Sequence, residues 1–557
     1  MSPSTPGPDW TVPALLCRQV KERGDEPFIR MHDAQQWRTY VEVHDAAEQT
    51  GRRLAALGVV AGAIVPTMVP TANEAIDIWF GLNRMGAADL PINNKYRGDS
   101  LISAVNMTGS RVAVVHTDHL DSFLKVSDRL RDLRTIAVVG GELRRGVHHE
   151  IELVHLDAVR PSALDLDAPI HSQVATVLLT SGTTGPSKGV MMPHGQVVTH
   201  ARQACALVDL TDGDIFFSAH PLFHMAGKLT AVLGSLMAGA RVVLAPQFNP
   251  GNWLRDIRDA GATVTLGHGP LLELIHRGPR RADDGENPLR ALAAGGVAPA
   301  LAAEFAERYQ VPLAETYGMS ELNIVASSRY DETRPVGSAG RVDSDLYDVR
   351  IVDTDTDIEV APGEVGEIAV RPRIPWTTTL GYLGMPERTV EAWRNLWMHT
   401  GDMGRIDEAG YLYFSERQGE RIRRKAENIS SFDIESVVSR FDGVAECAAV
   451  GVPSELAGDD AVKVCLVLAE GANVDFLDLL RHCVQGLPHF MVPRYFEVLD
   501  SMPRTPTAKI QKSVLRQRGV STATWDRHAA GIRIRELAEN VSRTAEYVDA
   551  GGERAQR

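Results

Sequence analysis

The sequence predicts an α/β protein with a large N-terminal domain of layered α/β subdomains and a small α+β C-terminal domain. Three observations support this fold class. Short apolar runs alternate with helical stretches from about residue 12 to 415, a strand-rich texture with Gly and Pro turns begins near 345, and a compact α+β unit follows an abruptly basic segment, RQGERIRRK, at 417–425. Such alternation is typical of layers built on mainly parallel sheets.

The basic segment marks the predicted boundary between the domains. We assign residues 1–416 to the large domain, 417–520 to the small domain and 521–557 to a helical tail. In the tail, apolar side chains recur at helical spacing, which favours an amphipathic helix. They are Ile534, Leu537, Val541, Ala545 and Val548. Packing on its own domain, contact with a second copy or another partner, and a frayed tail are all open for this segment.

The individual strands are expected where β-branched and apolar residues cluster between turn residues. In the α/β part these runs are Val112–Val115, Ile136–Val139, Val174–Leu179, Val190–Met192, Val242–Leu244 and Val264–Leu266. In the strand-rich part, expected to be a β-rich subdomain, they are Val349–Val352, Glu367–Val370 and Tyr411–Phe414. The small domain is expected to hold helices at about 432–441 and 475–485, and strands at about 444–452 and 461–468.

Charge and cysteine content exclude several classes of function. The 557 residues include 58 Lys+Arg and 72 Asp+Glu, a net charge of −14, which argues against binding nucleic acid polymers or an anionic membrane. The five cysteines are scattered and form no CxxC pair, which is typical of a reduced protein without structural zinc. Neither a signal peptide nor a run of about 18 apolar residues is evident, so we expect a cytoplasmic location.

The sharpest motif follows the run Val174–Leu179 and reads TSGTTGPSKG. Its glycines let the backbone approach a ligand closely, its hydroxyls and N–H groups can cradle phosphate oxygens, and Lys188 adds a positive charge. Ser187 before that lysine distinguishes the segment from a Walker loop. We therefore expect a phosphate loop made of Thr180, Ser181, Gly182, Thr183, Thr184 and Lys188.

This loop resembles the phosphate-loop signature of the adenylate-forming superfamily, which contains acyl-CoA ligases, peptide-synthetase adenylation domains and luciferases. Further segments similar to the family's motifs follow in the family's order, so the resemblance covers roughly residues 12–516. They are PLFHMAG at 221–227, AAGGVAP at 293–299, ETYGMSE at 315–321, HTGD at 399–402, FSER at 414–417 and PRTPTAKI at 503–510. The resemblance implies the adenylate-forming enzyme fold, with ATP, Mg2+ and CoA as the small molecules it uses.

The resemblance also assigns a nucleotide site. Tyr317 would stack on adenine, Ser320 would reach a phosphate, and Glu321 would hold Mg2+, because a hard cation prefers carboxylate oxygen. Asp402 would accept hydrogen bonds from both ribose hydroxyls. Beyond the phosphate loop, the implied nucleotide residues are Gly295, Gly296, Tyr317, Gly318, Ser320, Asp402 and Arg417.

Catalysis and substrate selection are assigned in the same way. Lys509 would be a mobile catalytic lysine beside Glu321, and His224 would be a gate to an acyl pocket. The pocket residues are His224, Met225, Ala226 and Gly227, and the small side chains suggest room for a bulky or apolar acyl group. The small domain would rotate about a hinge at Gly419, and the CoA residues would be Arg423, Arg424, Lys425 and Ala426.

The expected activity is that of a stand-alone acyl-CoA ligase, similar to carnitine-type ligases, which forms an acyl-adenylate with ATP and transfers the acyl group to CoA. Three small-domain positions depart from the family pattern: Gly419, Ala426 and Ala508. They leave open an enzyme that performs mainly thioester formation from a supplied acyl-adenylate. Loading of a carrier-protein pantetheine is a second alternative, and a silent protein that binds nucleotide or acyl-CoA is a third.

Overall fold

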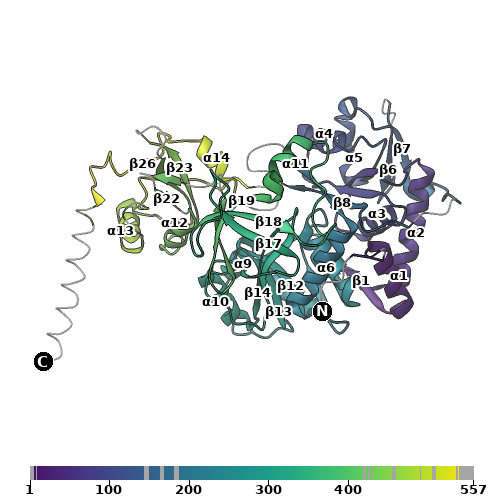
Figure 1. Cartoon of the computed structure of the whole chain (residues 1–557), viewed down its shortest axis with the longest axis horizontal. Helices are drawn as coiled ribbons and strands as arrows, with labels where there is room; N and C mark the ends of the chain where they lie inside the picture. Colours follow the sequence, from purple (N-terminus) through teal and green to yellow (C-terminus); the bar gives the residue numbers. More distant parts are fainter. Residues whose placement is uncertain are drawn as a thin grey trace.

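The structure is a computed structural model. It describes residues 6–7, 9–143, 150–163, 168–180, 187–417, 422–424, 427–429, 431–454, 460–487, 489, 491–504, 510–534 and 537. The side chains of 416–417, 423–424, 427–429 and 432–433 lie outside this description. Figure 1 shows the large domain along most of the long axis and the small domain, with α12 (Ser431–Val438) and α13 (Phe476–Gly486), at one end.

The first sheet of the large domain has seven strands in the order β7-β6-β5-β3-β4-β8-β9. They are β3 (Ile64–Met68), β4 (Ala88–Pro91), β5 (Val112–His116), β6 (Thr135–Val139), β7 (Glu152–His155), β8 (Val174–Thr180) and β9 (Lys188–Pro193). Neighbours are parallel except β8 and β9, which form an antiparallel pair. The mainly parallel arrangement predicted for the α/β part is therefore confirmed in this sheet.

Helices cover both faces of this sheet, which explains why its strands are continuously apolar. They are α2 (Tyr40–Ala56), α3 (Asn73–Arg84), α4 (Gly98–Asn106) and α5 (Thr117–Leu124), with 3-10 turns η1 (Ser127–Arg129) and η2 (Leu156–Ala158). Along β5, Val112 and Val114 share a buried cluster with residues of α2 and α3. Ala113 and Val115, which alternate with them, share a cluster with residues of α4 and α5.

The second sheet has thirteen strands in the order β17-β18-β19-β20-β16-β15-β14-β13-β12-β10-β11-β1-β2. Its parallel part contains β1 (Pro27–Met31), β10 (Ile215–Ser218), β11 (Arg241–Leu244), β12 (Val264–His268), β13 (Ala291–Gly295) and β14 (Leu313–Met319). The antiparallel strands are β2 (Arg38–Thr39), β15 (Asn323–Ser328), β16 (Gly340–Val342), β17 (Tyr347–Val352), β18 (Gly366–Pro372), β19 (Met398–Ile406) and β20 (Tyr411–Arg417). The predicted β-rich part thus continues the α/β sheet through the β14–β15 pair.

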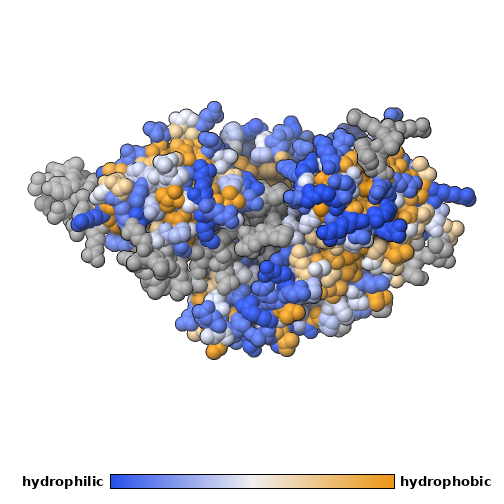
Figure 2. Space-filling model, turned by 90° about the horizontal axis from the view of Figure 1, so that it is seen from above, coloured by the Kyte–Doolittle hydropathy of each residue, from blue (hydrophilic) through white to orange (hydrophobic). Residues whose placement is uncertain are grey.

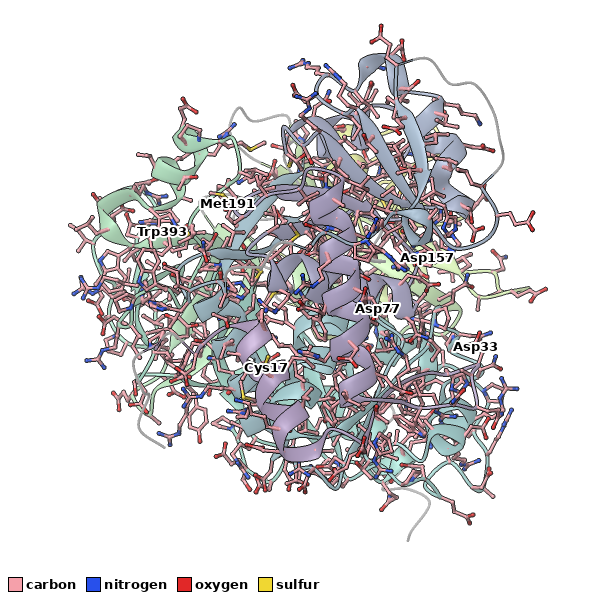
Figure 3. All side chains as sticks on the ribbon, turned by 90° about the vertical axis from the view of Figure 1, so that its right-hand side faces the viewer. Cys17, Asp33, Asp77, Asp157, Met191 and Trp393 are labelled. Atoms are coloured by element: carbon pink, nitrogen blue, oxygen red, sulfur yellow. The ribbon has the colours of Figure 1, made fainter. Side chains whose placement is uncertain are left out.

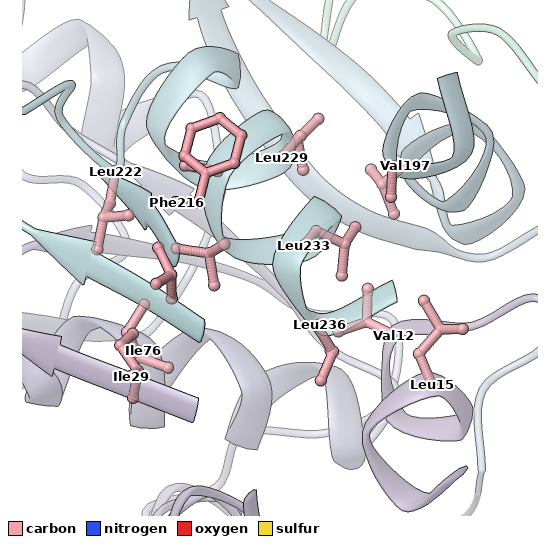
Figure 4. Packing of buried hydrophobic residues seen from close by; sticks show 14 of the residues in the cluster. Val12, Leu15, Ile29, Ile76, Val197, Phe216, Leu222, Leu229, Leu233 and Leu236 are labelled. Atoms are coloured by element: carbon pink, nitrogen blue, oxygen red, sulfur yellow. The ribbon is translucent and has the colours of Figure 1, made fainter. Parts of the chain in front are cut away.

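The largest core cluster lies where helices join the two sheets. The remaining helices of the large domain are α1 (Val12–Arg23), α6 (His194–Val208), α7 (Gly234–Ala238), α8 (Trp253–Ala260), α9 (Gly269–His276), α10 (Pro299–Tyr309) and α11 (Pro386–Ala392), with the π-helix η3 (Ala226–Leu233) and the 3-10 turn η4 (Arg394–Leu396). Figure 4 shows Leu229 and Leu233 of η3 packed among Phe216, Val197 and Leu222. This packing fixes η3 between the sheets.

The small domain has its own four-stranded sheet, ordered β23-β24-β25-β26. Its elements are β21 (Ile422–Arg424), β22 (Glu427–Ile429), β23 (Val444–Pro453), β24 (Asp460–Leu468), β25 (Tyr495–Val498), β26 (Trp525–Asp526) and α14 (Lys512–Gln517), besides α12 and α13. The expected strands and helices are confirmed, although the first helix ends at Val438 rather than near 441. A fully buried ion pair joins Lys463 to Glu497 inside this domain.

The prediction that 521–557 form a helical tail is wrong for its first residues. Trp525–Asp526 form β26, which pairs antiparallel with β25, and Trp525 stacks on Phe496 with ring centroids 5.7 Å apart. The physical reason is that the Trp525 side chain buries more apolar surface when it covers the apolar face of the sheet than it would on a solvated helix. Ile534 and Leu537 also pack against the core of the small domain, which favours the alternative of packing on its own domain.

Figure 2 shows hydrophilic and hydrophobic residues interspersed over one face of the molecule, with hydrophobic residues gathered on its lower right-hand part. None of the described helices has the length and apolar character needed to cross a membrane.

Helices α2 and α3 approach each other unusually closely. Figure 3 shows this side of the molecule, with Cys17 marking α1 and Asp77 marking α3. Gly51 of α2 faces Gly81 of α3, and a methyl group added at Gly81 would lie 2.7 Å from the carbonyl oxygen of Ala47 and 2.8 Å from the backbone nitrogen of Gly51. Both obstacles are backbone atoms, so the helices would have to move apart.

We expect Gly81→Ala to destabilise the large domain by about 1–3 kcal/mol, because overpacking outweighs the gain in helix propensity. The measurement is the thermal unfolding midpoint. Gly213→Ala is the matched control, since an added methyl group there meets only the Thr211 hydroxyl at 3.7 Å. Equal midpoints for Gly81→Ala and the wild-type protein would contradict the close-approach argument.

Candidate active site

The predicted phosphate loop connects two paired strands. Thr180 ends β8 and Lys188 begins β9, and the two residues pair directly in the antiparallel register. The Thr180 hydroxyl lies 3.4 Å from the Lys188 carbonyl oxygen. Ser187 contacts the hydroxyl of Tyr96 at 3.1 Å. Ser181, Gly182, Thr183 and Thr184, the centre of the predicted loop, lie outside the described residues.

Lys188 and Glu321 both contact the side chain of Tyr382. The Lys188 ammonium lies 4.6 Å from the centroid of the Tyr382 ring, and the Tyr382 hydroxyl donates a hydrogen bond of 2.9 Å to Glu321 Oε1. Burial raises the pKa of Tyr382, and the neighbouring Glu321 carboxylate raises it further, so the phenol stays protonated as a donor. The sequence analysis did not identify Tyr382.

The turn that carries Ser320 and Glu321 is held from several sides. Gln196 of α6 donates a hydrogen bond of 2.9 Å to the Ser320 carbonyl oxygen, and the Thr379 backbone donates one of 2.9 Å to the Glu321 carbonyl oxygen. Asn323, with a positive φ of 69°, donates to the carbonyl oxygens of Gln196 and Thr377 at 3.0 and 3.2 Å. These bonds orient the Glu321 carboxylate, which is buried at 5% exposure.

Tyr317 and Asp402, distant in the chain, are hydrogen-bonded. The Tyr317 hydroxyl donates to Asp402 Oδ2 at 3.0 Å, and its ring stacks beside Phe414 with centroids 6.0 Å apart. Asp402 also pairs in register with Arg417, on β20. The structure therefore brings together two of the motifs that the resemblance assigns to one nucleotide site.

A buried charge network holds the turn before Asp402, and the sequence analysis assigned its members no role. Glu367 Oε1 accepts a hydrogen bond of 3.0 Å from the Gly401 backbone, whose φ is 70°. Glu367 Oε2 accepts from Arg394 and from His399 Nδ1, each at 2.9 Å. The signal in the sequence is a charged residue that begins the otherwise apolar run Glu367–Val370.

Three residues in or beside this network could in principle hold a metal ion. Asp357, Glu367 and His399 place potential ligand atoms within 4.8 Å of one another. Arg394, however, contacts Asp357 at 3.3 Å and Glu367 at 2.9 Å. A guanidinium thus supplies the positive charge that this acidic cluster requires, and the cluster is a structural support for the Gly401–Asp402 turn.

The predicted adenine segment lies at the end of β13. Gly295 closes this strand, and Gly296 follows with a φ of 65°, where L side chains are strained. Glu315 of β14 supports it, since Glu315 Oε1 accepts a hydrogen bond of 3.4 Å from the Val297 backbone. Burial raises the pKa of Glu315 to about 7, an effect that Arg334 at 3.4 Å only partly opposes.

The gate segment begins the π-helix η3. His224 is half-buried, and its Nδ1 accepts a hydrogen bond of 3.3 Å from the Ala226 backbone. Met225 and Ala226 are likewise half-buried. Gly227 has a different role from the one expected: an added methyl group would lie 2.4 Å from the His220 carbonyl oxygen, so its smallness permits backbone contact rather than acyl space.

Several assigned residues cannot be placed. Lys509, Gly419, Lys425 and Ala426 lie outside the described residues, as do the side chains of Arg417, Arg423 and Arg424. The backbone of Arg423 and Arg424 belongs to β21, which pairs with β22.

We expect Glu367→Gln to weaken nucleotide binding roughly tenfold, because the loss of a charge-assisted network of about 1–2 kcal/mol loosens the turn that carries Asp402. The measurement is the dissociation constant of AMP by calorimetry, with the thermal midpoint recorded in parallel. Glu364→Gln on the exposed loop is the control. A lower midpoint with unchanged AMP affinity would show that the network supports the fold and not the site.

We expect Glu315 to lower the stability of the folded protein in a pH-dependent way. Between about pH 4.5 and 7 the folded protein retains a proton that the unfolded chain has released, so stability falls as pH rises through this interval and stays lower above it. Glu315→Gln removes this effect. The stability of the variant relative to wild type should therefore rise by about 3 kcal/mol from pH 4 to pH 8 in unfolding measurements. A constant difference across this range would contradict the raised pKa.

Comparison with known proteins agrees with this geometry. Residues 16–383 match the family model of the AMP-binding enzyme, and residues 433–509 match that of the AMP-binding enzyme C-terminal domain. A crotonobetaine/carnitine–CoA ligase of Salmonella heidelberg (strain SL476) is 29% identical over 86% of this chain and 93% of its own length. A feruloyl-CoA synthase of Amycolatopsis sp. is 30% identical over 86% of this chain and 94% of its own length.

A solved structure shows the same fold. The crystal structure of the anthranilate CoA ligase AuaEII in complex with anthranoyl-AMP has a TM-score of 0.82 and 24% identity, covering 91% of this chain and 97% of its own. The two family models match the large N-terminal domain and the small C-terminal domain, in that order along the chain. The chain therefore belongs to the AMP-binding enzyme family, and by class it is an AMP-forming acyl-CoA ligase.

Proposed function

We propose that this ligase activates a bulky, mainly apolar carboxylic acid, which enters beside His224, and transfers it to the thiol of free CoA. One observation carries the ATP-dependent part of the proposal: Tyr382 links Lys188 to Glu321, and a hydrogen bond links Tyr317 to Asp402. The segment Phe216–His220 before the gate contains no carboxylate that could hold an amino group. The relatives' names support a CoA ligase rather than an enzyme that loads a carrier protein.

In the first half-reaction, a carboxylate oxygen of the acid attacks the α-phosphorus of ATP, the bond to the β-phosphate oxygen breaks, and pyrophosphate leaves. Two anions must approach each other, so positive charge near the phosphates lowers the barrier. The Lys188 ammonium is held on the Tyr382 ring for this purpose, and Lys509 supplies a second cation from the small domain. Tyr317 and Asp402 hold adenine and ribose, and Arg417 assists at the ribose.

Glu321 is the residue that fits Mg2+. Its carboxylate is a hard oxygen donor, buried and oriented by Tyr382 and by the hydrogen bonds of its turn. When bound, Mg2+ would neutralise phosphate charge. The hydrogen bond from Tyr382 fixes Glu321 Oε1, and the other carboxylate oxygen would be the ligand for the ion.

In the second half-reaction, the CoA thiol attacks the carbonyl carbon of the acyl-adenylate, and the bond to AMP breaks. We assign Arg423, Arg424, Lys425 and Ala426 to the CoA face of the small domain, which would reach the site by rotation at Gly419. The cationic side chains complement the phosphates of CoA. Gly419 frees the backbone at the hinge, and this helps either orientation form.

A carboxylate panel with ATP, Mg2+ and CoA tests the activity. We expect pyrophosphate release together with a thioester mass for at least one bulky acid. Absence of pyrophosphate with every acid, combined with thioester formation from synthetic acyl-AMP, would instead favour the single half-reaction.

We expect Lys509→Ala to reduce pyrophosphate release by at least about a hundredfold, because it removes a cation aimed at developing charge. Thioester formation from synthetic acyl-AMP should change less than about threefold, since that step does not use this ammonium. Lys125→Ala, at an exposed position of the large domain, is the control. Equal losses in both half-reactions would contradict the assigned role.

A further inference from the structure

A second polar centre lies one helical turn beyond the gate. Lys228 of η3 donates its backbone N–H to the His224 carbonyl oxygen at 3.0 Å. Its ammonium lies 2.6 Å from Asp89 Oδ2 on β4 and 3.9 Å from the centroid of the Trp79 ring on α3. The side chains of Lys228 and Asp89 are 2% and 4% exposed, so the ion pair is almost entirely removed from water.

This centre contains polar atoms that lack a partner. Asp89 Oδ1 and Trp79 Nε1 are buried and make no hydrogen bond to any described residue. An orphaned buried donor or acceptor costs on the order of 1–3 kcal/mol, and a buried ion pair often stabilises a fold no more than apolar packing of similar volume does. Both considerations favour a bound polar group over a purely structural pair.

A small cavity gives these atoms access to a ligand. Asp89, Trp79 and Lys228 line it together with apolar side chains, and its volume of about 20 Å³ admits one water-sized group. The apolar lining includes Ile78, Ile92, Leu222 and Phe223. The last two immediately precede His224 in the chain, so the cavity adjoins the gate.

The position of the cavity fits the far end of a substrate. Asp89 pairs with Thr176 on β8, and four residues along β8 is Thr180, at the start of the phosphate loop. Four residues of strand span roughly 13 Å. An acid whose carboxylate lies at the phosphate loop would need a tail of about this length to reach the cavity.

The orphaned atoms define the chemistry of that tail. Asp89 Oδ1 needs a hydrogen-bond donor and Trp79 Nε1–H needs an acceptor, and a hydroxyl group supplies both with one oxygen atom. A methyl group in the same place would leave both unpaired. We propose that this cavity binds a hydroxyl group at the distal end of the acyl substrate and so selects hydroxylated acids. The inference rests on the proposed acyl pocket beside His224.

The test compares matched acids by pyrophosphate release: 3-(4-hydroxyphenyl)propanoic acid with 3-phenylpropanoic acid, and 6-hydroxyhexanoic acid with hexanoic acid. We expect kcat/KM to be at least tenfold higher for the hydroxylated member of the pair that fits the pocket. Absence of pyrophosphate with these four acids and with every acid of the carboxylate panel contradicts the proposed function and this inference with it. Equal kcat/KM for both members of each pair contradicts the proposed hydroxyl selection by the cavity, while the pyrophosphate release still supports the proposed ligase activity.

A double variant tests whether Lys228 and Asp89 cause the preference for hydroxylated acids. Lys228→Met/Asp89→Leu removes both charges together, so neither is left buried and unpaired. We expect the hydroxyl preference to fall to about one. The matched control is Arg308→Met/Asp284→Leu, which removes a buried ion pair with a 2.7 Å contact. Neither residue lines this cavity, so we expect this variant to keep the preference for hydroxylated acids. A preference that persists in the Lys228/Asp89 variant overturns the proposal.

Discussion

The turn between β14 and β15 is the constraint on which the site depends. It is held by Gln196 from α6 and by the Thr377–Thr379 segment, and Asn323 adopts a positive φ to meet both. The segment beyond it is in turn bound to β9, because the Leu380 backbone donates to the Met191 carbonyl oxygen at 2.9 Å. A single turn therefore ties the β8–β9 hairpin to β14, and Glu321 lies within this turn.

Buried carboxylates recur through the site, and each has a defined donor. Glu321 receives the Tyr382 hydroxyl, Asp402 the Tyr317 hydroxyl, and Glu367 the Gly401 backbone and Arg394. Removing a carboxylate from water is costly unless hydrogen bonds replace the lost hydration. These donors meet that cost in the folded state, so the carboxylates are already oriented and would need little reorganisation in the proposed nucleotide site.

Prediction from the sequence succeeded where local chemistry decides the outcome. The β-branched runs became strands almost as expected, and the strands that flank the predicted phosphate loop form the antiparallel pair β8–β9. It failed where long-range packing decides. Gly227 looked like space for a substrate, yet the backbone of His220 occupies that space, and Trp525 left the expected tail to join a sheet.

The sequence by itself determined the order of the motifs and predicted which side chains could react, because ammonium, carboxylate and glycine-rich backbone have chemical properties that no neighbour can supply. Only the tertiary structure decided which groups meet. Tyr382 joins Lys188 to Glu321, Glu367 holds the turn of Asp402, and Lys228 meets Asp89 across 139 positions of the chain. Such pairings depend on how strands and helices from distant segments stack, and the spacing of residues along one chain carries no record of that arrangement.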